Sequence, residues 1–142
     1  MARTRSRLLL SALVAMLALA MVASPALAAK GAGKPGGGST GSSLSLRILT
    51  STDGVANYGE TVTFDIVTSA TRPFVSVNCY QAGTWVYSAS VGYFADYPWS
   101  QTFVLASTSW PAGSGDCTAR LYTSRDGIRT TTLATLGFSV QP

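Results

Sequence analysis

Apolar and polar residues alternate in short runs along most of the chain after residue 43. Leu44, Leu46 and Ile48 share one side of an extended segment, and the same period-two pattern returns over 62–66. No segment in this part of the chain repeats its apolar residues at a helical spacing. We therefore expect β-strands over these segments: 44–48, 62–66, 74–80, 85–87, 102–105, 117–123 and 134–140.

Turn-forming residues separate the predicted strands. Such signals occur at Asp53-Gly54, Asn57-Tyr58-Gly59, Ala82-Gly83 and Asp126-Gly127. Seven or eight short strands at this spacing predict an all-β fold, a two-sheet antiparallel sandwich. Trp110, at a corner followed by Pro111, is expected to be a core residue.

The two cysteines predict how two of these strands pair. If Cys79 lies opposite Cys117 in an antiparallel ladder, Val77 meets Ala119 and Val75 meets Leu121. All of these side chains then share one face and are apolar or sulfur-bearing. The sequence therefore predicts a buried Cys79–Cys117 disulfide between neighbouring strands of one sheet.

A hairpin at Asp126-Gly127 extends this inward-facing set. Pairing Arg125 with Ile128 across the two turn residues places Ala119 opposite Ala134 and Cys117 opposite Leu136. A slip of one residue would invert the buried face. The agreement between the two registers supports the predicted sheet.

The first 28 residues have the three parts of a secretory signal. Arg3, Arg5 and Arg7 form a basic start, an apolar run covers 8–22, and Ala26-Leu27-Ala28 is a small-x-small cleavage site. We expect cleavage after Ala28, secretion, and no membrane span after cleavage. An uncleaved N-terminal anchor is the alternative, although the run is slightly short for the ~20 residues of a spanning helix.

A Gly/Ser-rich segment over 29–43 follows the signal. It contains six glycines after Lys30 and almost nothing apolar to bury, which is typical of a flexible linker. Residues 44–142 then form one small domain with a thin core. Export makes a disulfide in that domain chemically plausible.

The positive net charge of the whole chain belongs mostly to the signal and the linker. From Leu44 onward five arginines oppose six acidic residues, so the domain carries about −1. Nucleic-acid binding requires a basic surface, and this composition does not predict one.

One stretch of the sequence resembles a known family. The residues Gly59-Glu60-Thr61-Val62-Thr63-Phe64, the strand ending at Cys79 and the run from Trp110 through Tyr122 look like a bacterial secreted immunoglobulin-like domain. The resemblance covers nearly all of 44–142 and implies an immunoglobulin-like sandwich with a role in adhesion or binding. Antibody-type domains join opposite sheets by their disulfide, whereas this chain is expected to join neighbouring strands.

Catalytic chemistry is not indicated by the residues present. The chain has no histidine, and both cysteines are assigned to the disulfide. No phosphate-binding glycine loop or spaced cluster of metal ligands occurs, and no spacing forces two carboxylates together. We expect no enzyme activity, no metal and no cofactor.

The aromatic residues carry the only functional signal. Pairing Tyr80 with Trp85 across Ala82-Gly83 places aromatic side chains on the outward face of the disulfide-bearing sheet, and the following loop adds more. The candidate ligand-binding residues are Tyr80, Trp85, Tyr87 and Tyr122 on the strands and Tyr93, Tyr97 and Trp99 in the loop, beside Phe74, Asn78, Phe94 and Arg120. The alternative is that loop 89–99 folds over the sheet and forms a second small core.

These features predict a secreted, non-catalytic binding or adhesion module. Its partner would be an extracellular glycan or a protein, recognised through the aromatic sheet face. Two other interpretations remain open at this stage: a purely structural module, and a small secreted inhibitor that presents residues 92–99 to its target.

Overall fold

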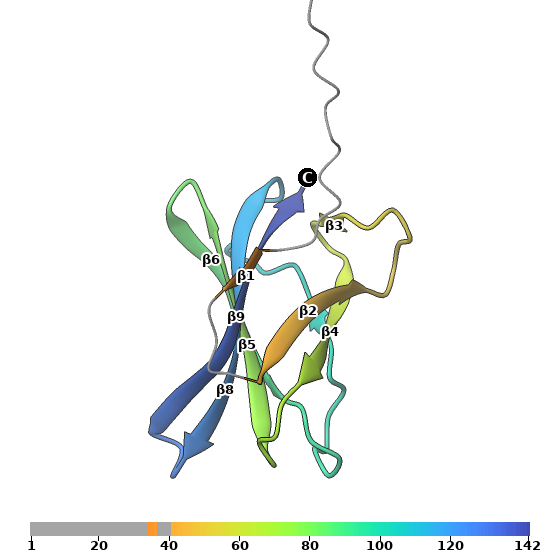
Figure 1. The fold of residues 1–142 in the computed structure, drawn as a ribbon. Coiled ribbons are helices and arrows are strands. Elements are labelled where there is room, and N and C mark those ends of the chain that lie inside the picture. The colour runs from red at the N-terminus through yellow and green to blue at the C-terminus, as the bar shows by residue number, and fades with distance from the viewer. Residues whose placement is uncertain (1–33, 37–40) are drawn as a thin grey trace, which may run out of the picture.

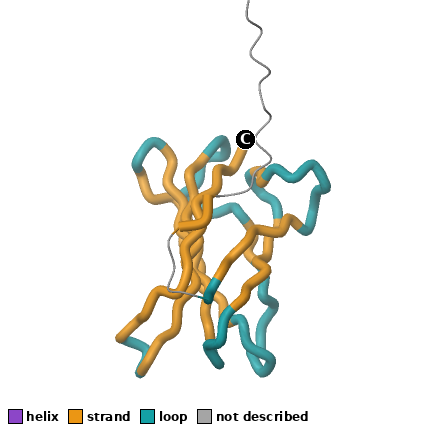
Figure 2. The backbone as a smooth tube through the Cα atoms, viewed as in Figure 1, coloured by secondary structure: helices purple, strands orange, loops and turns teal. Residues whose placement is uncertain are grey.

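The computed structural model describes residues 34–36 and 41–142 and shows two β-sheets with no helix among these residues (Figures 1 and 2). The predicted signal over 1–28 lies outside the described residues. The strands are β1 (Lys34–Gly36), β2 (Ser43–Ile48), β3 (Ala56–Asn57), β4 (Thr61–Val67), β5 (Pro73–Gln81), β6 (Thr84–Gly92), β7 (Phe103–Val104), β8 (Gly115–Arg125) and β9 (Arg129–Gln141).

The strands form a large sheet and a small sheet. The large sheet has the order β1-β9-β8-β5-β6, with β3 paired to the far end of β9, and the small sheet has the order β2-β4-β7. Every long pairing is antiparallel, and only the two-residue β3–β9 pairing is parallel. The predicted all-β, two-sheet architecture is therefore confirmed.

The two sheets enclose one hydrophobic core. Alternate residues of β5 and β8 point into it from the large sheet, while Val62 and Phe64 of β4 enter from the small sheet. The ring of Phe64 meets that of Phe138 edge-on, with centroids 6.2 Å apart, and so joins the sheets directly. Trp110 is 2% exposed, which confirms its predicted core position.

The pairing of β5 with β8 follows the register predicted from the cysteines. Cys79 lies opposite Cys117, with Val77 opposite Ala119 and Val75 opposite Leu121. The disulfide is formed, its Cα atoms are 4.0 Å apart, and both residues are buried. It joins neighbouring strands of one sheet, as expected.

The predicted register between β8 and β9 is wrong by two residues. Arg125 pairs with Arg129 rather than Ile128, so the loop has three residues, and Ala119 faces Leu136 rather than Ala134. Likewise Cys117 faces Phe138 rather than Leu136. The longer loop shifts the register by one residue, and a bulge between Leu121 and Tyr122 shifts it by another. Each one-residue shift turns the side chains of a strand to the opposite face, so the two shifts together leave them on the expected face. The predicted inward residues of β9 are therefore buried: Ala134, Leu136, Phe138 and Val140.

Several strand ends also differ from the sequence expectation. Strand β6 continues to Gly92, well past the predicted 85–87, and β7 has only two residues. Lys34–Gly36, within the segment assigned to the linker, pairs with Thr135–Gly137 of β9. The large sheet thereby gains a short strand beyond β9.

Replacing both cysteines, as in Cys79→Ala/Cys117→Ala, is expected to lower the free energy of unfolding by roughly 4 kcal/mol. The bond closes a loop with a sequence separation of 38 residues and so restricts the unfolded chain. Urea unfolding of the oxidised protein and the double variant measures the difference. A loss below ~1 kcal/mol would show that the β5–β8 ladder is stable without its covalent link.

Candidate functional site

The outer face of the large sheet, the side turned away from the small sheet, holds most of the predicted binding residues. The structure separates them into two groups at opposite ends of β5. The Tyr80 row comprises Trp85, Tyr80, Asp116 and Ser139, and the Phe74 cluster comprises Phe74, Phe94, Tyr97, Trp99 and Tyr122.

The Tyr80 row crosses four strands of the large sheet. Tyr80 pairs with Trp85 of β6 on one side and with Asp116 of β8 on the other, and Asp116 pairs with Ser139 of β9. The predicted Tyr80–Trp85 pairing is thus confirmed. It depends on a two-residue turn in which Ala82 and Gly83 both adopt positive φ, 48° and 80°. The two aromatic side chains remain 45% and 58% exposed.

A polar groove of about 350 Å³ lies beside Tyr80. Its lining consists of Tyr80, Ala82, Ser114, Gly115, Asp116, Ser139, Val140 and Gln141. The Ser139 hydroxyl donates to Oδ1 of Asp116 over 3.2 Å, which orients the carboxylate. Neighbouring Gln81 donates from Nε2 to the carbonyls of Ala112 and Ser114, at 3.0 and 3.2 Å, and holds the loop that forms the rim.

Tyr87 does not lie on the outer face, so its predicted orientation is wrong. A register shift between Cys79 and Tyr80 leaves Val86 as an extra residue in β6, and Tyr87 then pairs with Cys79 on the inward side. Tyr87 is 9% exposed and its ring lies 6.3 Å from that of Trp110. Burial raises the pKa of Tyr87 to about 12.

Tyr93 is likewise buried rather than displayed by the loop. Its hydroxyl accepts a hydrogen bond from the backbone N–H of Phe64 at 3.1 Å and donates to the carbonyl of Gln101 at 3.0 Å. It also lies 3.1 Å from the hydroxyl of Thr63. Desolvation raises the pKa of Tyr93, against the lowering effect of the hydrogen bonds from Thr63 and Phe64. Tyr93 thus links the end of β6 to β4 of the small sheet.

The Phe74 cluster shows that the loop after β6 folds over one end of the outer face. The ring centroids of Phe94 and Tyr97 lie 5.5 and 6.5 Å from that of Phe74, in edge-on contacts. Tyr122 stacks on Phe74 from the other side at 5.7 Å. The alternative of a second small core is therefore correct at this end of the sheet, whereas Tyr80 and Trp85 stay uncovered at the other.

Polar contacts fix the outer layer of the Phe74 cluster. The hydroxyl of Tyr122 is hydrogen-bonded to that of Ser90 at 2.8 Å, and the guanidinium of Arg120 lies 4.7 Å over the Tyr122 ring. Trp99 contacts Tyr97 edge-on but is itself 71% exposed. Of the three predicted loop aromatics, only Trp99 remains largely accessible.

The sequence interpretation missed the polar half of the Tyr80 row. Asp116 adjoins Cys117, so the cysteine register already places it opposite Tyr80. Ser139 required the β8–β9 register, which the unforeseen bulge had hidden. Of these two residues, only Asp116 could have been placed in the row from the sequence.

Residues 34–36 and 41–142 contain no group of three or more His, Cys, Asp or Glu side chains that could hold a metal ion, and both cysteines are bonded. No helix among these residues is long and apolar enough to cross a bilayer. The disulfide indicates a non-cytoplasmic environment. Comparisons with protein-family models, curated proteins and solved structures found no match to this chain.

Gly92→Ala is expected to destabilise the protein by ~1–3 kcal/mol through overpacking. A Cβ at this position would lie 2.6 Å from the Phe94 ring and closer still to the Tyr97 ring. Gly137→Ala is the matched control, because Gly137 lies in the same sheet and a Cβ added there would meet nothing within 4 Å. Thermal unfolding and limited proteolysis of the loop after β6 measure the effect. Equal stability of both variants would contradict the packed-loop arrangement.

The stability of the protein is expected to fall as pH rises from 10 towards 12, partly because of Tyr87. In that window the unfolded chain loses the phenolic proton while the folded protein, with its raised pKa, retains it. Urea unfolding at about pH 8 and about pH 11 should show a smaller loss for Tyr87→Phe than for the unmodified protein. An unchanged pH dependence in Tyr87→Phe would disprove this role.

Proposed function

We propose that the protein is an exported, non-catalytic binding module with an immunoglobulin-like sandwich, and that it recognises carbohydrate along the Tyr80 row. The observation that carries the proposal is the pairing of two exposed aromatic side chains, Tyr80 and Trp85, beside a polar groove. Most other aromatic residues of the domain are packed against its own side chains.

A sugar ring suits this combination because it is amphipathic. Its C–H faces are apolar and stack on aromatic rings, while its hydroxyls require donors and acceptors at the ring edge. Tyr80 supplies a rigid ring, and the carboxylate of Asp116 and hydroxyl of Ser139 supply the polar groups next to it. An apolar peptide side chain would cover the carboxylate of Asp116 and leave the acceptor sites that Ser139 does not use without partners, which is unfavourable.

The dimensions of the row fit an extended ligand. Neighbouring strands lie ~4.8 Å apart, so the four positions from Trp85 to Ser139 span ~14 Å across the sheet. The row is fixed by backbone ladders on both sides of Tyr80, and its geometry therefore requires little ordering on binding. This length favours a polymeric glycan over a single small sugar.

The groove supports binding rather than hydrolysis. Glycoside hydrolysis generally uses a pair of carboxyl groups on either side of the bond that is cleaved. Among the residues that line this groove, Asp116 alone carries a carboxylate side chain. The inhibitor interpretation is less favoured, because Tyr93, Phe94 and Tyr97 of the 92–99 segment contact the domain itself.

The proposal is tested by co-sedimentation of the purified protein with insoluble peptidoglycan, chitin and cellulose. The protein should bind at least one of these polymers, and Tyr80→Ala/Trp85→Ala should reduce the affinity by ~10-fold or more, equivalent to ~1.4 kcal/mol. Asp116→Asn should weaken binding to a lesser degree, since it retains one acceptor oxygen.

Trp99→Ala provides the matched control, because it also removes an exposed tryptophan but at the other end of the domain. It should bind as the unmodified protein does. Absence of binding to all three polymers, or equal binding by the Tyr80→Ala/Trp85→Ala variant, would overturn the proposal and favour a protein partner or a structural role.

A further inference from the structure

We propose that the opposite end of the domain docks on an anionic phospholipid bilayer, with Ile128 and Trp99 entering the interface and arginines contacting the headgroup phosphates. This end contains the β8–β9 turn and the loop after β6, and it lies at the far end of the strands from the C-terminus (Figure 1). The proposal does not depend on carbohydrate binding at the Tyr80 row.

The first observation is the placement of exposed apolar side chains. Ile128 is 85% exposed and Trp99 is 71% exposed, the highest values among the exposed large hydrophobic residues of the described chain. One lies in the turn between β8 and β9 and the other in the loop after β6, where it contacts the Tyr97 ring by one edge and leaves most of its surface exposed. Burial of such side chains in a bilayer interface is favourable, and tryptophan in particular prefers the headgroup level.

The second observation is an uneven distribution of charge along the domain. The end that contains the β8–β9 turn and the start of β5 carries Arg72, Arg125 and Arg129 against Asp96 and Asp126, a net charge of +1. The opposite end carries Asp116 and, beside β3, Asp53 and Glu60, while Arg47 of β2 is paired with Asp65 of β4 and adds no net charge. An anionic surface would therefore attract the end that bears Ile128 and Trp99.

The arginines flanking Ile128 are placed against each other. Arg125 and Arg129 form the last pair of the β8–β9 ladder, directly opposite each other. Like charges in this position destabilise a hairpin. The nearest acid, Asp126, accepts hydrogen bonds from the backbone N–H groups of Ile128 and Arg129 through Oδ1. A phosphate group between the two guanidinium groups would relieve the repulsion and match their hydrogen-bonding geometry.

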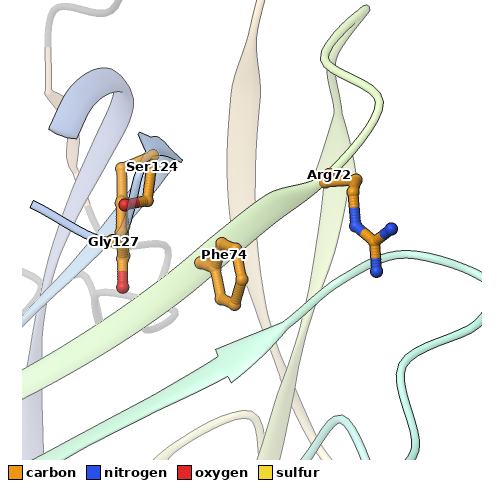
Figure 3. Close-up of a pocket in the computed structure, with 5 residues that line it drawn as sticks. Arg72, Phe74, Ser124 and Gly127 are labelled. Atoms are coloured by element: carbon orange, nitrogen blue, oxygen red, sulfur yellow. The ribbon is translucent and has the colours of Figure 1, made fainter. Parts of the chain in front are cut away.

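A groove of about 400 Å³ connects the turn to the rest of this end. It is lined by Arg72, Phe74, Tyr122, Ser124 and Gly127. In Figure 3, Phe74 lies between Arg72 on one side and Ser124 and Gly127 on the other. The groove therefore has an aromatic centre, with a guanidinium at one margin and the β8–β9 turn at the opposite margin.

Arg72 links this groove to the loop that carries Trp99. Its guanidinium lies 4.5 Å over the Phe94 ring and 3.3 Å from the carboxylate of Asp96. Tyr97, in turn, contacts both Phe74 and Trp99. The two apolar tips thus border one continuous surface that combines basic and apolar groups, as bilayer-binding surfaces do. A soluble polyanion has no apolar phase in which the exposed side chain of Ile128 could be buried.

The test is co-sedimentation of the full protein with vesicles of phosphatidylcholine alone or mixed with phosphatidylglycerol. Binding should require phosphatidylglycerol and decrease with added salt. Arg125→Gln/Arg129→Gln should weaken binding by roughly 10-fold to 30-fold, and Ile128→Ser should weaken it by a comparable factor. Tryptophan fluorescence should shift to the blue on binding, and the shift should be lost in Trp99→Phe.

The two proposed surfaces are distinguished by crossed controls. Tyr80→Ala/Trp85→Ala should bind vesicles normally, and Ile128→Ser should bind polysaccharide normally if the first proposal holds. Far-UV circular dichroism and thermal unfolding confirm that each variant is folded. The bilayer proposal is overturned if the protein does not bind phosphatidylglycerol vesicles. It is also overturned if Ile128→Ser binds as tightly as the unmodified protein, because the surface would then recognise anions without entering the bilayer.

Discussion

The pairing of β5 with β8 is the constraint on which the rest of the structure depends. The Cys79–Cys117 bond fixes this ladder covalently, so the register of both strands is set along their whole shared length. On the inner side that register buries Val77 against Ala119 in the common core. On the outer side the same register places Asp116 beside Tyr80. Core packing and the candidate site are thus two consequences of one pairing, because alternate residues of a strand face opposite sides of the sheet.

The ends of the large sheet differ in what covers them. At the start of β5, Gly92 pairs with Phe74 and leaves room for the Phe94 and Tyr97 rings, so the loop after β6 can lie on the sheet. At the end of β5 the neighbour across the ladder is Trp85, and only a two-residue turn follows Tyr80 and Gln81. A turn of that length has no side chains with which to cover the aromatic pair. Loop length and one glycine therefore decide which aromatic residues become core and which remain accessible.

Strand pairings were predicted correctly from the sequence where a cysteine pair or a tight turn determines the register. The cysteines determined β5–β8, and Ala82-Gly83 determined the Tyr80–Trp85 pair. Prediction failed at the two bulges, where an extra residue enters a strand without a recognisable sequence mark. At Val86 the single insertion turned Tyr87 from the outer face into the core. In β9 the bulge compensated for the longer turn, so the buried face was predicted correctly from an incorrect register. A register error of one residue moves side chains to the other face of the sheet, whereas a register error of two residues changes only which side chains are neighbours.

The same strands also determine how the two proposed surfaces would work together. From Asp116 to Arg125, β8 advances nine residues, which at ~3.3 Å per residue is ~30 Å. A bilayer bound at Ile128 would therefore lie about one domain length from the Tyr80 row. Asp53 and Glu60 lie beside β3, which pairs with Val140 and Gln141 at the same end of the domain as the row, and their repulsion by the anionic surface would favour the same orientation. Such an arrangement holds the aromatic row, on the outer face of the large sheet, at a distance from the membrane that leaves it accessible to a polymer in the surrounding matrix.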